Sequence, residues 1–276
     1  MTASSAFAAV QKALADALSL NTAGIGRPHT IVALPSFNVS ETLLSHYADR
    51  LPSLEHRYLL ALLILRIDGC RLVFLTCRQP PPEVVDLYIS LLPAEVRPTA
   101  MERFRVVVVD DLSARPVAAK ALERPEILAA IRRAVGDTPA FIEPWSVGGY
   151  ERDLSVALGI PINGTAPELW PLGFKSAGRH LFRRAGVPMP DGFEDLHTVG
   201  DAVGAIERLR AAKPGLGAVV LKHDDSGAGD GNAVLDLAEL EPAGTTMAAR
   251  RLRARIKGLP PWYLNELPKG FVAEER

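Results

Sequence analysis

One segment of this 276-residue chain, residues 219–232, holds the pattern most suited to chemistry. Three glycines, Gly227, Gly229 and Gly231, alternate there with small or acidic residues. Without Cβ atoms the backbone can come close to a ligand, and successive N–H groups can converge on one anion. Lys222, just before this stretch, would add a point charge. The segment therefore predicts a phosphate-binding loop.

Other interpretations of the same loop make different structural predictions. A dinucleotide-binding turn needs a helix after the glycines, but residues 232–237 alternate as a strand does. A Walker loop needs Gly-Lys-Ser/Thr, which is not found after these glycines. A calcium loop built from Asp224, Asp225 and Asp230 lacks its closing glutamate. On this segment alone, an ordinary flexible hairpin also stays open.

A second lysine, Lys175, stands at the start of a predicted helix over residues 175–184. Gly186 and Pro188 stop that helix. We expect Lys175 and Lys222 to converge on one cleft, with the glycine-rich loop closing over it.

The elements that must position these residues fall into two patterns. Up to about residue 170, predicted strands alternate with helices, which favours a parallel α/β sheet. The four valines at 106–109 suit a strand covered on both faces. The strands are predicted at 30–34, 71–76, 104–109 and 140–143, and the helices at 4–20, 58–65, 83–92, 125–135 and 152–158.

After residue 170 the order becomes α+β. We place the domain boundary between residues 165 and 174, giving domains 1–170 and 171–276. The predicted helices are 175–184, 200–212 and most of 239–262, and the predicted strands are 218–221, 233–237 and 271–273.

Composition narrows the class of protein. Hydrophobic residues make up 48% and charged residues 23%, as in globular proteins. The net charge of -1 gives no overall field for nucleic acid, although residues 250–257 form a short basic run. The most apolar run, 58–67, is about half the length of a membrane-spanning helix. We expect a cytoplasmic protein with no membrane or nucleic-acid partner, and with Cys70 and Cys77 reduced.

Taken together, these motifs resemble the nucleotide-binding region of ATP-grasp enzymes. That region has a lysine, a helix with a Gly-x-Pro exit, a second lysine on a strand, and a glycine-rich flap. In particular, the chain resembles ATP-grasp carboxylate–amine (peptide) ligases of the pheganomycin type. The similarity extends through residues 31–36, 58–66, 122–125, 151–152, 158–161 and 231–235.

The resemblance implies a fold and a set of site residues. A parallel Rossmann-like pre-ATP-grasp domain, 1–170, would precede an α+β ATP-grasp nucleotide-binding subdomain, 171–276. Lys175 and Lys222 would contact the nucleotide phosphates. The flap would be formed by Ser226, Gly227, Ala228 and Gly229, the adenine would be read by backbone near Ala273 and Glu274, and the ribose would be reached by Glu274 or Glu275.

The resemblance also implies a reaction. ATP and Mg²⁺ would convert a carboxylate of a small molecule or peptide into an acyl phosphate, which an amine would attack to give an amide. In the family the metal ligands follow the hinge, and this chain ends at Arg276, just after it. We therefore expect the Mg²⁺ ligands outside this chain, which would be a fragment or a truncated copy.

Whether these residues alone catalyse anything stays open at this point. One alternative is a non-catalytic remnant that binds a nucleotide or a partner chain. A weaker one is an NAD-dependent enzyme using Gly227 and Gly229, which requires a helix from about Gly231 onward.

Overall fold

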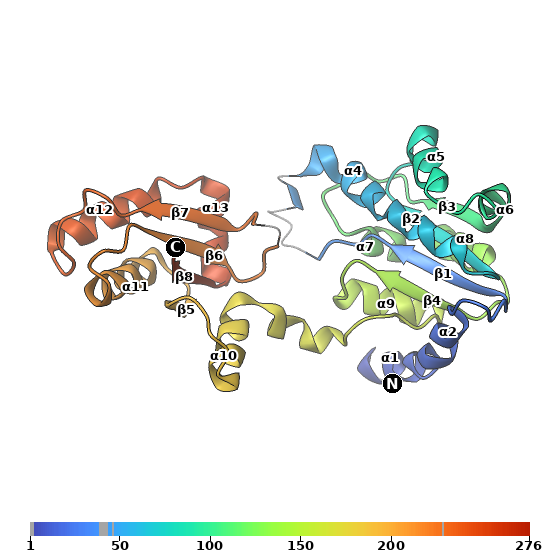
Figure 1. The fold of residues 1–276 in the computed structure, drawn as a ribbon, viewed down its shortest axis with the longest axis horizontal. Helices are drawn as coiled ribbons and strands as arrows, with labels where there is room; N and C mark the ends of the chain where they lie inside the picture. Colours follow the sequence, from blue (N-terminus) through green and yellow to red (C-terminus); the bar gives the residue numbers. More distant parts are fainter. Residues whose placement is uncertain (1–2, 39–43, 46, 228) are drawn as a thin grey trace. The chain divides into compact units, whose positions relative to one another are not determined.

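The computed structural model describes residues 3–38, 44–45, 47–227 and 229–276. The chain divides into two compact units, Met1–Glu168 and Leu169–Arg276 (Figure 1). Each unit has its own sheet and its own hydrophobic core. Within the described residues, no helix is long and apolar enough to cross a membrane.

The first unit is built on a four-stranded parallel sheet with the strand order β3-β2-β1-β4. In the register, Ile31 of β1 lies between Leu72 of β2 and Phe141 of β4. The sheet confirms the parallel α/β architecture predicted from the alternating pattern. Its strands are β1 (His29–Leu34), β2 (Cys70–Thr76), β3 (Phe104–Val108) and β4 (Ala140–Pro144).

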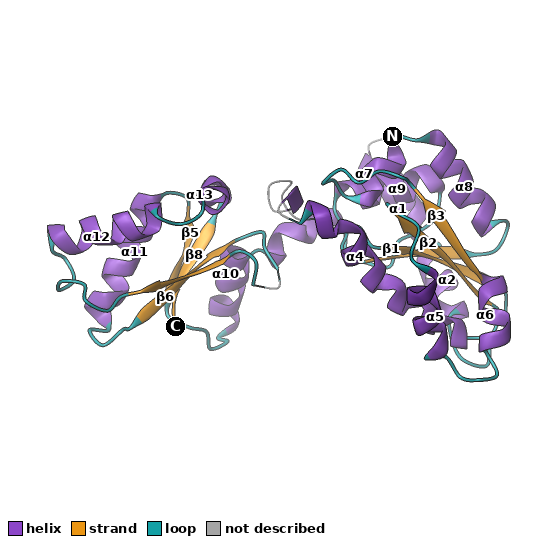
Figure 2. Ribbon diagram, turned by 90° about the horizontal axis from the view of Figure 1, so that it is seen from above, coloured by secondary structure: helices purple, strands orange, loops and turns teal. Residues whose placement is uncertain are grey.

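Helices cover both faces of this sheet (Figure 2). Side chains alternate along each strand, so Val32 of β1 packs with α1 and α7–α9, whereas Ile31 packs with α2, η2, α5 and α6. The helices are α1 (Ala3–Gln11), α2 (Leu14–Leu20), η1 (Ala48–Arg50), α4 (Leu51–His56), η2 (Arg57–Arg66), α5 (Pro82–Ser90), α6 (Arg97–Arg103), α7 (Val117–Leu122), α8 (Pro125–Val135) and α9 (Gly149–Leu158).

The valine-rich strand differs from its prediction. β3 lies at the edge of the sheet, where Arg105 is exposed and Val106 and Val108 are only half-buried. The strand buried along its whole length is the inner strand β1, and the other inner strand, β2, is buried everywhere except at Arg71. Consecutive valines therefore identified a strand but did not reveal its place in the sheet.

Two predicted helices also take a different form. Residues 4–20 form two helices, α1 and α2, and the predicted helix at 58–65 is the 3₁₀ helix η2. The Arg103 guanidinium donates to Leu65 O at 2.8 Å and to Cys70 O at 3.1 Å. This side chain therefore satisfies carbonyls at and beyond the end of η2. Cys70 and Cys77 are buried and free, as predicted.

The second unit contains an antiparallel sheet with the order β5-β8-β6-β7. The helices α11, α12 and α13 pack on one face, and Figure 2 shows α10 on the other side of the sheet. The strands are β5 (Gly192–Leu196), β6 (Ala218–His223), β7 (Asn232–Asp236) and β8 (Phe271–Glu275), and the helices are η3 (Pro167–Gly173), α10 (Lys175–Ala185), α11 (Val199–Ala212), α12 (Thr246–Lys257), α13 (Pro261–Glu266) and η4 (Leu267–Lys269).

Strand β5 and the start of α12 differ from the prediction. The strand β5 was missed because its sequence, Gly-Phe-Glu-Asp-Leu, is short and half polar. The helix α12 begins at Thr246, so residues 239–245 are not helical as expected. Thr245 caps α12, because its Oγ1 accepts a hydrogen bond from Ala248 N at 3.2 Å.

Candidate functional site

The strand period of two determines which side chains of the second unit are available for chemistry. On β6, Val219 and Leu221 point into the core, so Lys222 lies on the opposite face. On β8, Ala273 belongs to the core and Glu274 lies on that opposite face. The register pairs Val220 with Glu274, which places Glu274 diagonally across from Lys222. Nζ of Lys222 contacts Oε2 of Glu274.

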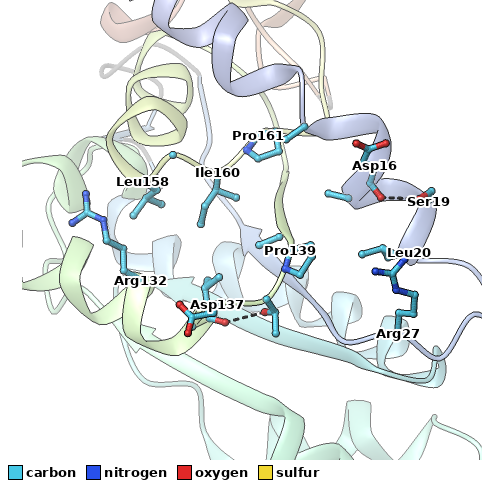
Figure 3. Close-up of a pocket in the computed structure, with 17 residues that line it drawn as sticks. Asp16, Ser19, Leu20, Arg27, Arg132, Asp137, Pro139, Leu158, Ile160 and Pro161 are labelled. Carbon is cyan, nitrogen blue, oxygen red and sulfur yellow. Dashed lines mark hydrogen bonds between the residues drawn. The ribbon is translucent and has the colours of Figure 1, made fainter.

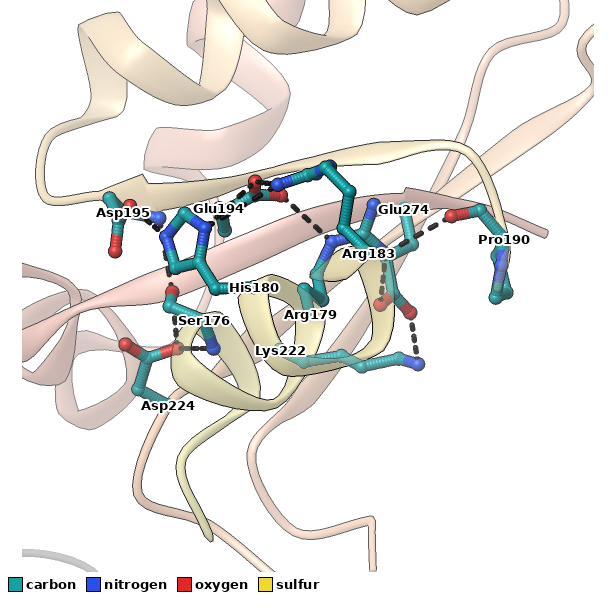
Figure 4. A network of polar contacts seen from close by, with 10 residues as sticks. All are labelled: Ser176, Arg179, His180, Arg183, Pro190, Glu194, Asp195, Lys222, Asp224 and Glu274. Carbon is teal, nitrogen blue, oxygen red and sulfur yellow. Dashed lines mark hydrogen bonds and ion pairs between the residues drawn. The ribbon is translucent and has the colours of Figure 1, made fainter. Parts of the chain in front are cut away.

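A buried arginine holds the other oxygen of Glu274 (Figure 4). Arg179 of α10 donates from Nη1 to Glu274 Oε1 at 2.9 Å and to Pro190 O at 3.1 Å. Its Nε donates to Glu194 Oε2 at 3.0 Å. Only 5% of the Arg179 side chain and 10% of the Glu274 side chain are exposed, so this pair is largely desolvated.

A further arginine, Arg183, contacts Oε1 of Glu194 (Figure 4). Burial raises the pKa of Glu194, but hydrogen bonds from Arg183 and Arg179 outweigh it and hold that pKa below its ordinary value. Three cations, Lys222, Arg179 and Arg183, thus face two carboxylates, Glu274 and Glu194.

Lys175 opens α10 and reaches the glycine-rich loop. Its Nζ donates to Ser226 O at 2.6 Å, to Ser226 Oγ at 2.9 Å and to Asp224 O at 3.4 Å. Burial lowers the pKa of Lys175, although the nearby carboxylates of Asp224 and Asp225 oppose this shift. Lys175 thus contacts the loop directly, and Lys222 lies on the strand that leads into it; their convergence on one cleft stays a prediction.

The loop between β6 and β7 closes through its own backbone. Asp230 N donates to Gly227 O at 3.0 Å, and Asn232 N donates to Gly229 O at 3.0 Å. Gly229 has φ +87°, a left-handed conformation that glycine adopts readily. A Cβ on Gly231 would lie 2.3 Å from Ser226 Oγ. The loop is thus shaped by its glycines, although Ala228 lies outside the described residues.

The residues after the loop exclude one alternative. Asn232–Asp236 form β7, which pairs antiparallel with β6. A dinucleotide-binding turn would need a helix there. The prediction of a strand is confirmed, and the NAD-dependent interpretation is removed.

The calcium interpretation also finds no support in the described part of the loop. Oδ1 of Asp224 accepts two hydrogen bonds from Ser176, one from N at 3.0 Å and one from Oγ at 2.8 Å. Asp224 thus caps α10 rather than facing a shared ion centre. In the described residues, no group of three or more His, Cys, Asp or Glu side chains is arranged to hold a metal ion.

Three residues of β8 were predicted to contact the nucleotide, Ala273, Glu274 and Glu275. They lie inside the sheet or in ion pairs. Ala273 is flanked by Leu221 on β6 and Phe193 on β5. Oε1 of Glu275 accepts a hydrogen bond from Asp191 N at 2.9 Å, and its Oε2 contacts Lys213.

The adenine and ribose contacts at these positions stay predictions. The Ala273 backbone already belongs to an inner strand of the sheet. Glu274 and Glu275 would each have to give up an ion pair to reach a ribose.

Sequence reasoning missed the side chains that organise this face. Arg179 follows Lys175 by four residues, a spacing that places both on one side of a helix. Phe174, which precedes α10, provides no side-chain cap. A helix start without a local cap indicates a capping residue elsewhere in the chain, which is Asp224.

A hollow of about 880 Å³ lies in the first unit (Figure 3). It is lined by residues that precede β1 and β4, such as Arg27 and Pro139, and by the ends of α8 and α9. Parallel α/β sheets bind ligands at the carboxyl ends of their strands, and this hollow lies at the opposite ends.

At the carboxyl end of β4, Trp145 packs against neighbouring aromatic rings. Its ring centroid lies 5.4 Å from that of Phe37 and 5.9 Å from that of Tyr58. Tyr58 also donates to Pro144 O at 3.0 Å. These contacts hold the Trp145 ring in place, although 59% of this residue is exposed.

Comparison with known proteins finds similarity to a ligase. No family model matches the chain. It is 27% identical over 259 residues to an L-propargylglycine–L-glutamate ligase of Streptantibioticus cattleyicolor. The matched region covers 89% of this chain and 52% of that protein. The predicted relationship to ATP-grasp peptide ligases is confirmed. The chain spans about half the length of this relative.

Two other similarities are more limited. The chain is 29% identical over 150 residues to the IQ motif-containing protein H of Danio rerio. The matched region covers 51% of this chain and 14% of that protein. The structure of D-alanyl-alanine synthetase A from Vibrio cholerae matches with a TM-score of 0.43 and 12% identity, covering 90% of this chain and 59% of that one. The mixed α/β architecture of this chain, a parallel sheet followed by an antiparallel one, is the predicted fold class.

Proposed function

We propose that this chain is the nucleotide-gripping part of an ATP-dependent carboxylate–amine ligase. Residues 1–170 would be the Rossmann-like pre-ATP-grasp domain, and 171–276 the ATP-grasp N-terminal subdomain. The observation that carries the proposal is that Lys175 contacts the glycine-rich loop, while Lys222, on the strand that leads into that loop, lies on the sheet face that α10 contacts through Arg179. The relative that joins two amino acids supports the reaction class.

The lysines would act by position and charge. In the proposed reaction a carboxylate oxygen attacks the γ-phosphorus, the β–γ bridging bond breaks, and ADP leaves. The amine nitrogen then attacks the acyl carbon, phosphate leaves with the electron pair of the C–O bond, and the nitrogen loses a proton. Phosphoryl transfer depends mainly on alignment and on neutralising charge, which Lys175 and Lys222 would provide for the phosphate oxygens.

The loop fits a phosphate in two respects. Ser226 already offers a hydroxyl and a carbonyl to the Lys175 ammonium, so that ammonium lies where a phosphate oxygen could replace them. Gly227 has open space around its Cα, which leaves its backbone accessible. Magnesium is different, because the described residues hold no suitable set of ligands.

Calorimetry with Mg-ATP on the full 276-residue chain tests the proposal. We expect saturable binding that weakens roughly tenfold to a hundredfold in Lys175→Met and in Lys222→Met, since each variant loses a charge-assisted hydrogen bond to phosphate. Lys257→Met is the matched control, because Lys257 is exposed on α12. No binding by the unmodified chain, or equal binding by all the variants, would contradict the proposal.

A second assay separates a ligase from a binding module. Release of ADP is followed with pairs of amino acids, including L-glutamate as the amine or the carboxylate. Release that requires both amino acids and is lost in Lys222→Met supports amide formation. Binding of ATP without any release supports a non-catalytic nucleotide-binding module.

A further inference from the structure

One carboxylate joins the parts of the proposed phosphate site. Asp224 follows β6, the strand that carries Lys222, and it begins the glycine-rich loop. Its Oδ1 accepts from Ser176 N at 3.0 Å and from Ser176 Oγ at 2.8 Å (Figure 4). Ser176 is the second residue of α10, directly after Lys175. One side chain thus links the loop to the helix that carries the other lysine.

The backbone of Asp224 makes the same connection. Its carbonyl accepts hydrogen bonds from Lys175 N and from Lys175 Nζ, each at 3.4 Å. Its N–H donates to Gly270 O at 3.0 Å, just before β8. A Cβ on Gly270 would lie 2.7 Å from Asp224 Oδ2, and Gly270 has φ +121°. The fold therefore keeps this position free of a side chain where the carboxylate lies.

Ser176 extends the link to β5. Its Oγ donates to Asp224 and accepts from Asp195 N at 3.0 Å. Asp195 has φ +56° and lies where the β5–β8 register shifts between Phe193 and Leu196. Only 3% of Ser176 is exposed, so these hydrogen bonds are shielded from water. A hydroxyl with both a donor and an acceptor partner has little freedom to rotate.

We propose that Asp224 is the positioning residue of the phosphate site. By capping α10 through Ser176, it fixes the position of Lys175 relative to the strand that carries Lys222. This inference rests on the proposed function. Asp224 acts through the two lysines and is not assigned any contact with the nucleotide.

Geometry, rather than charge, is the predicted basis of this role. Asparagine keeps an oxygen acceptor at the same place and caps helices about as well as aspartate. Asp224→Asn should therefore retain the site, whereas Asp224→Ala should release the loop from α10. Asp201 provides the matched control, because its Oδ2 accepts from Thr198 N at 2.8 Å and it caps α11 in the same unit.

The first measurement is hydrogen exchange of residues 223–227 and 229–231 in the full chain without nucleotide. We expect roughly tenfold faster exchange in Asp224→Ala, near wild-type exchange in Asp224→Asn, and no change in Asp201→Ala. Ser176→Ala, which keeps its backbone donor, should give an intermediate rate. If Asp224→Ala exchanges no faster than Asp201→Ala, the positioning role is wrong.

The second measurement is the Mg-ATP dissociation constant of the same variants. Asp224→Ala should bind roughly tenfold more weakly, with most of the affinity recovered in Asp224→Asn. If Asp224→Asn is as impaired as Asp224→Ala, the carboxylate acts through its charge and the inference is overturned. If the wild-type chain binds no ATP, the proposed function fails, while the exchange rates still decide whether Asp224 holds the loop.

Discussion

The glycine-rich loop predicts a sharp difference between two alanine substitutions only four residues apart. In Gly231→Ala the new Cβ would lie 2.3 Å from Ser226 Oγ and 2.5 Å from Ser226 Cβ. No real Cβ tolerates such distances, so Ser226 must move. In Gly227→Ala the new Cβ meets nothing within 4 Å, and Gly227 is not among the left-handed glycines.

The cost of moving Ser226 can be estimated from its contacts. Its Oγ donates to His223 O at 2.9 Å and accepts from Lys175 Nζ at 2.9 Å. Overpacking costs about 1–3 kcal/mol, and the bond to a charged donor adds about 1.5–3 kcal/mol if it is lost completely. Alanine restricts the unfolded chain and returns about 0.4–1 kcal/mol. We expect Gly231→Ala to destabilise the loop by about 2–4 kcal/mol, and Gly227→Ala to be neutral or slightly stabilising.

Native-state hydrogen exchange of the amides of β6 and β7 measures these differences within the full chain. Gly231→Ala should lower the opening free energy at Lys222 and Asn232, whereas Gly227→Ala should not. The amides of β1 in the other unit provide an internal reference. Equal opening free energies in the two variants, to within about 0.5 kcal/mol, would refute the close packing of Ser226 against Gly231.

Two further predictions concern the core beside the loop. Burial lowers the pKa of His223 in the folded state, whereas the unfolded chain takes up a proton near pH 6.5. The neutral His223 side chain therefore contributes fully to stability above pH 6.5. That contribution is lost as the pH falls from 6.5 toward the folded-state pKa. Urea denaturation from pH 7.5 to 5 should therefore show a steeper loss of stability in the wild type than in His223→Gln, and parallel profiles would contradict this. Tyr263 donates to Leu221 O at 2.9 Å and is 2% exposed. Tyr263→Phe should cost about 1–2 kcal/mol of unfolding free energy by thermal denaturation, and an unchanged midpoint would show that this hydrogen bond contributes nothing.

Much of the fold could be predicted because the spacing of apolar residues and the prolines and glycines that end helices and strands are local properties of the sequence. Strand β1 ends at Leu34 before Pro35, and α10 ends at Ala185 before Gly186 in a left-handed conformation. Strand order is not local, which explains why the valine run of β3 was expected inside the sheet but lies at its edge. β5 was missed because its sequence has little apolar content, and it is a strand because it pairs with β8, almost eighty residues later.

The candidate site shows the same division. The two lysines and the glycines could be identified because their types and order match a known pattern. Arg179 and Asp224 were missed because their roles depend on partners far along the chain: Arg179 on Glu274, and Asp224 on Ser176. A charged residue on a helix usually faces solvent. Only the tertiary structure shows that 5% of the Arg179 side chain is exposed.

The two lysines are held by different kinds of partner, and this difference determines what a phosphate has to displace. Lys175 contacts neutral oxygens of Ser226 and Asp224, and a phosphate oxygen competes well with them because its charge strengthens the hydrogen bond. Lys222 contacts a carboxylate, that of Glu274, which is a stronger competitor.

Glu274, however, is also paired with Arg179, which is itself fixed by Glu194 and Pro190 O. If Lys222 turns toward a phosphate, Glu274 therefore keeps one cation at 2.9 Å and is not left as an unpaired buried charge. The arginine thus lowers the cost of releasing Lys222. On this reasoning, Arg179→Met should weaken ATP binding, because Lys222 would then be the one cation, among the described residues, that is still ion-paired with Glu274. Calorimetry checks this, and unchanged affinity in a folded Arg179→Met variant would show that Glu274 does not restrain Lys222.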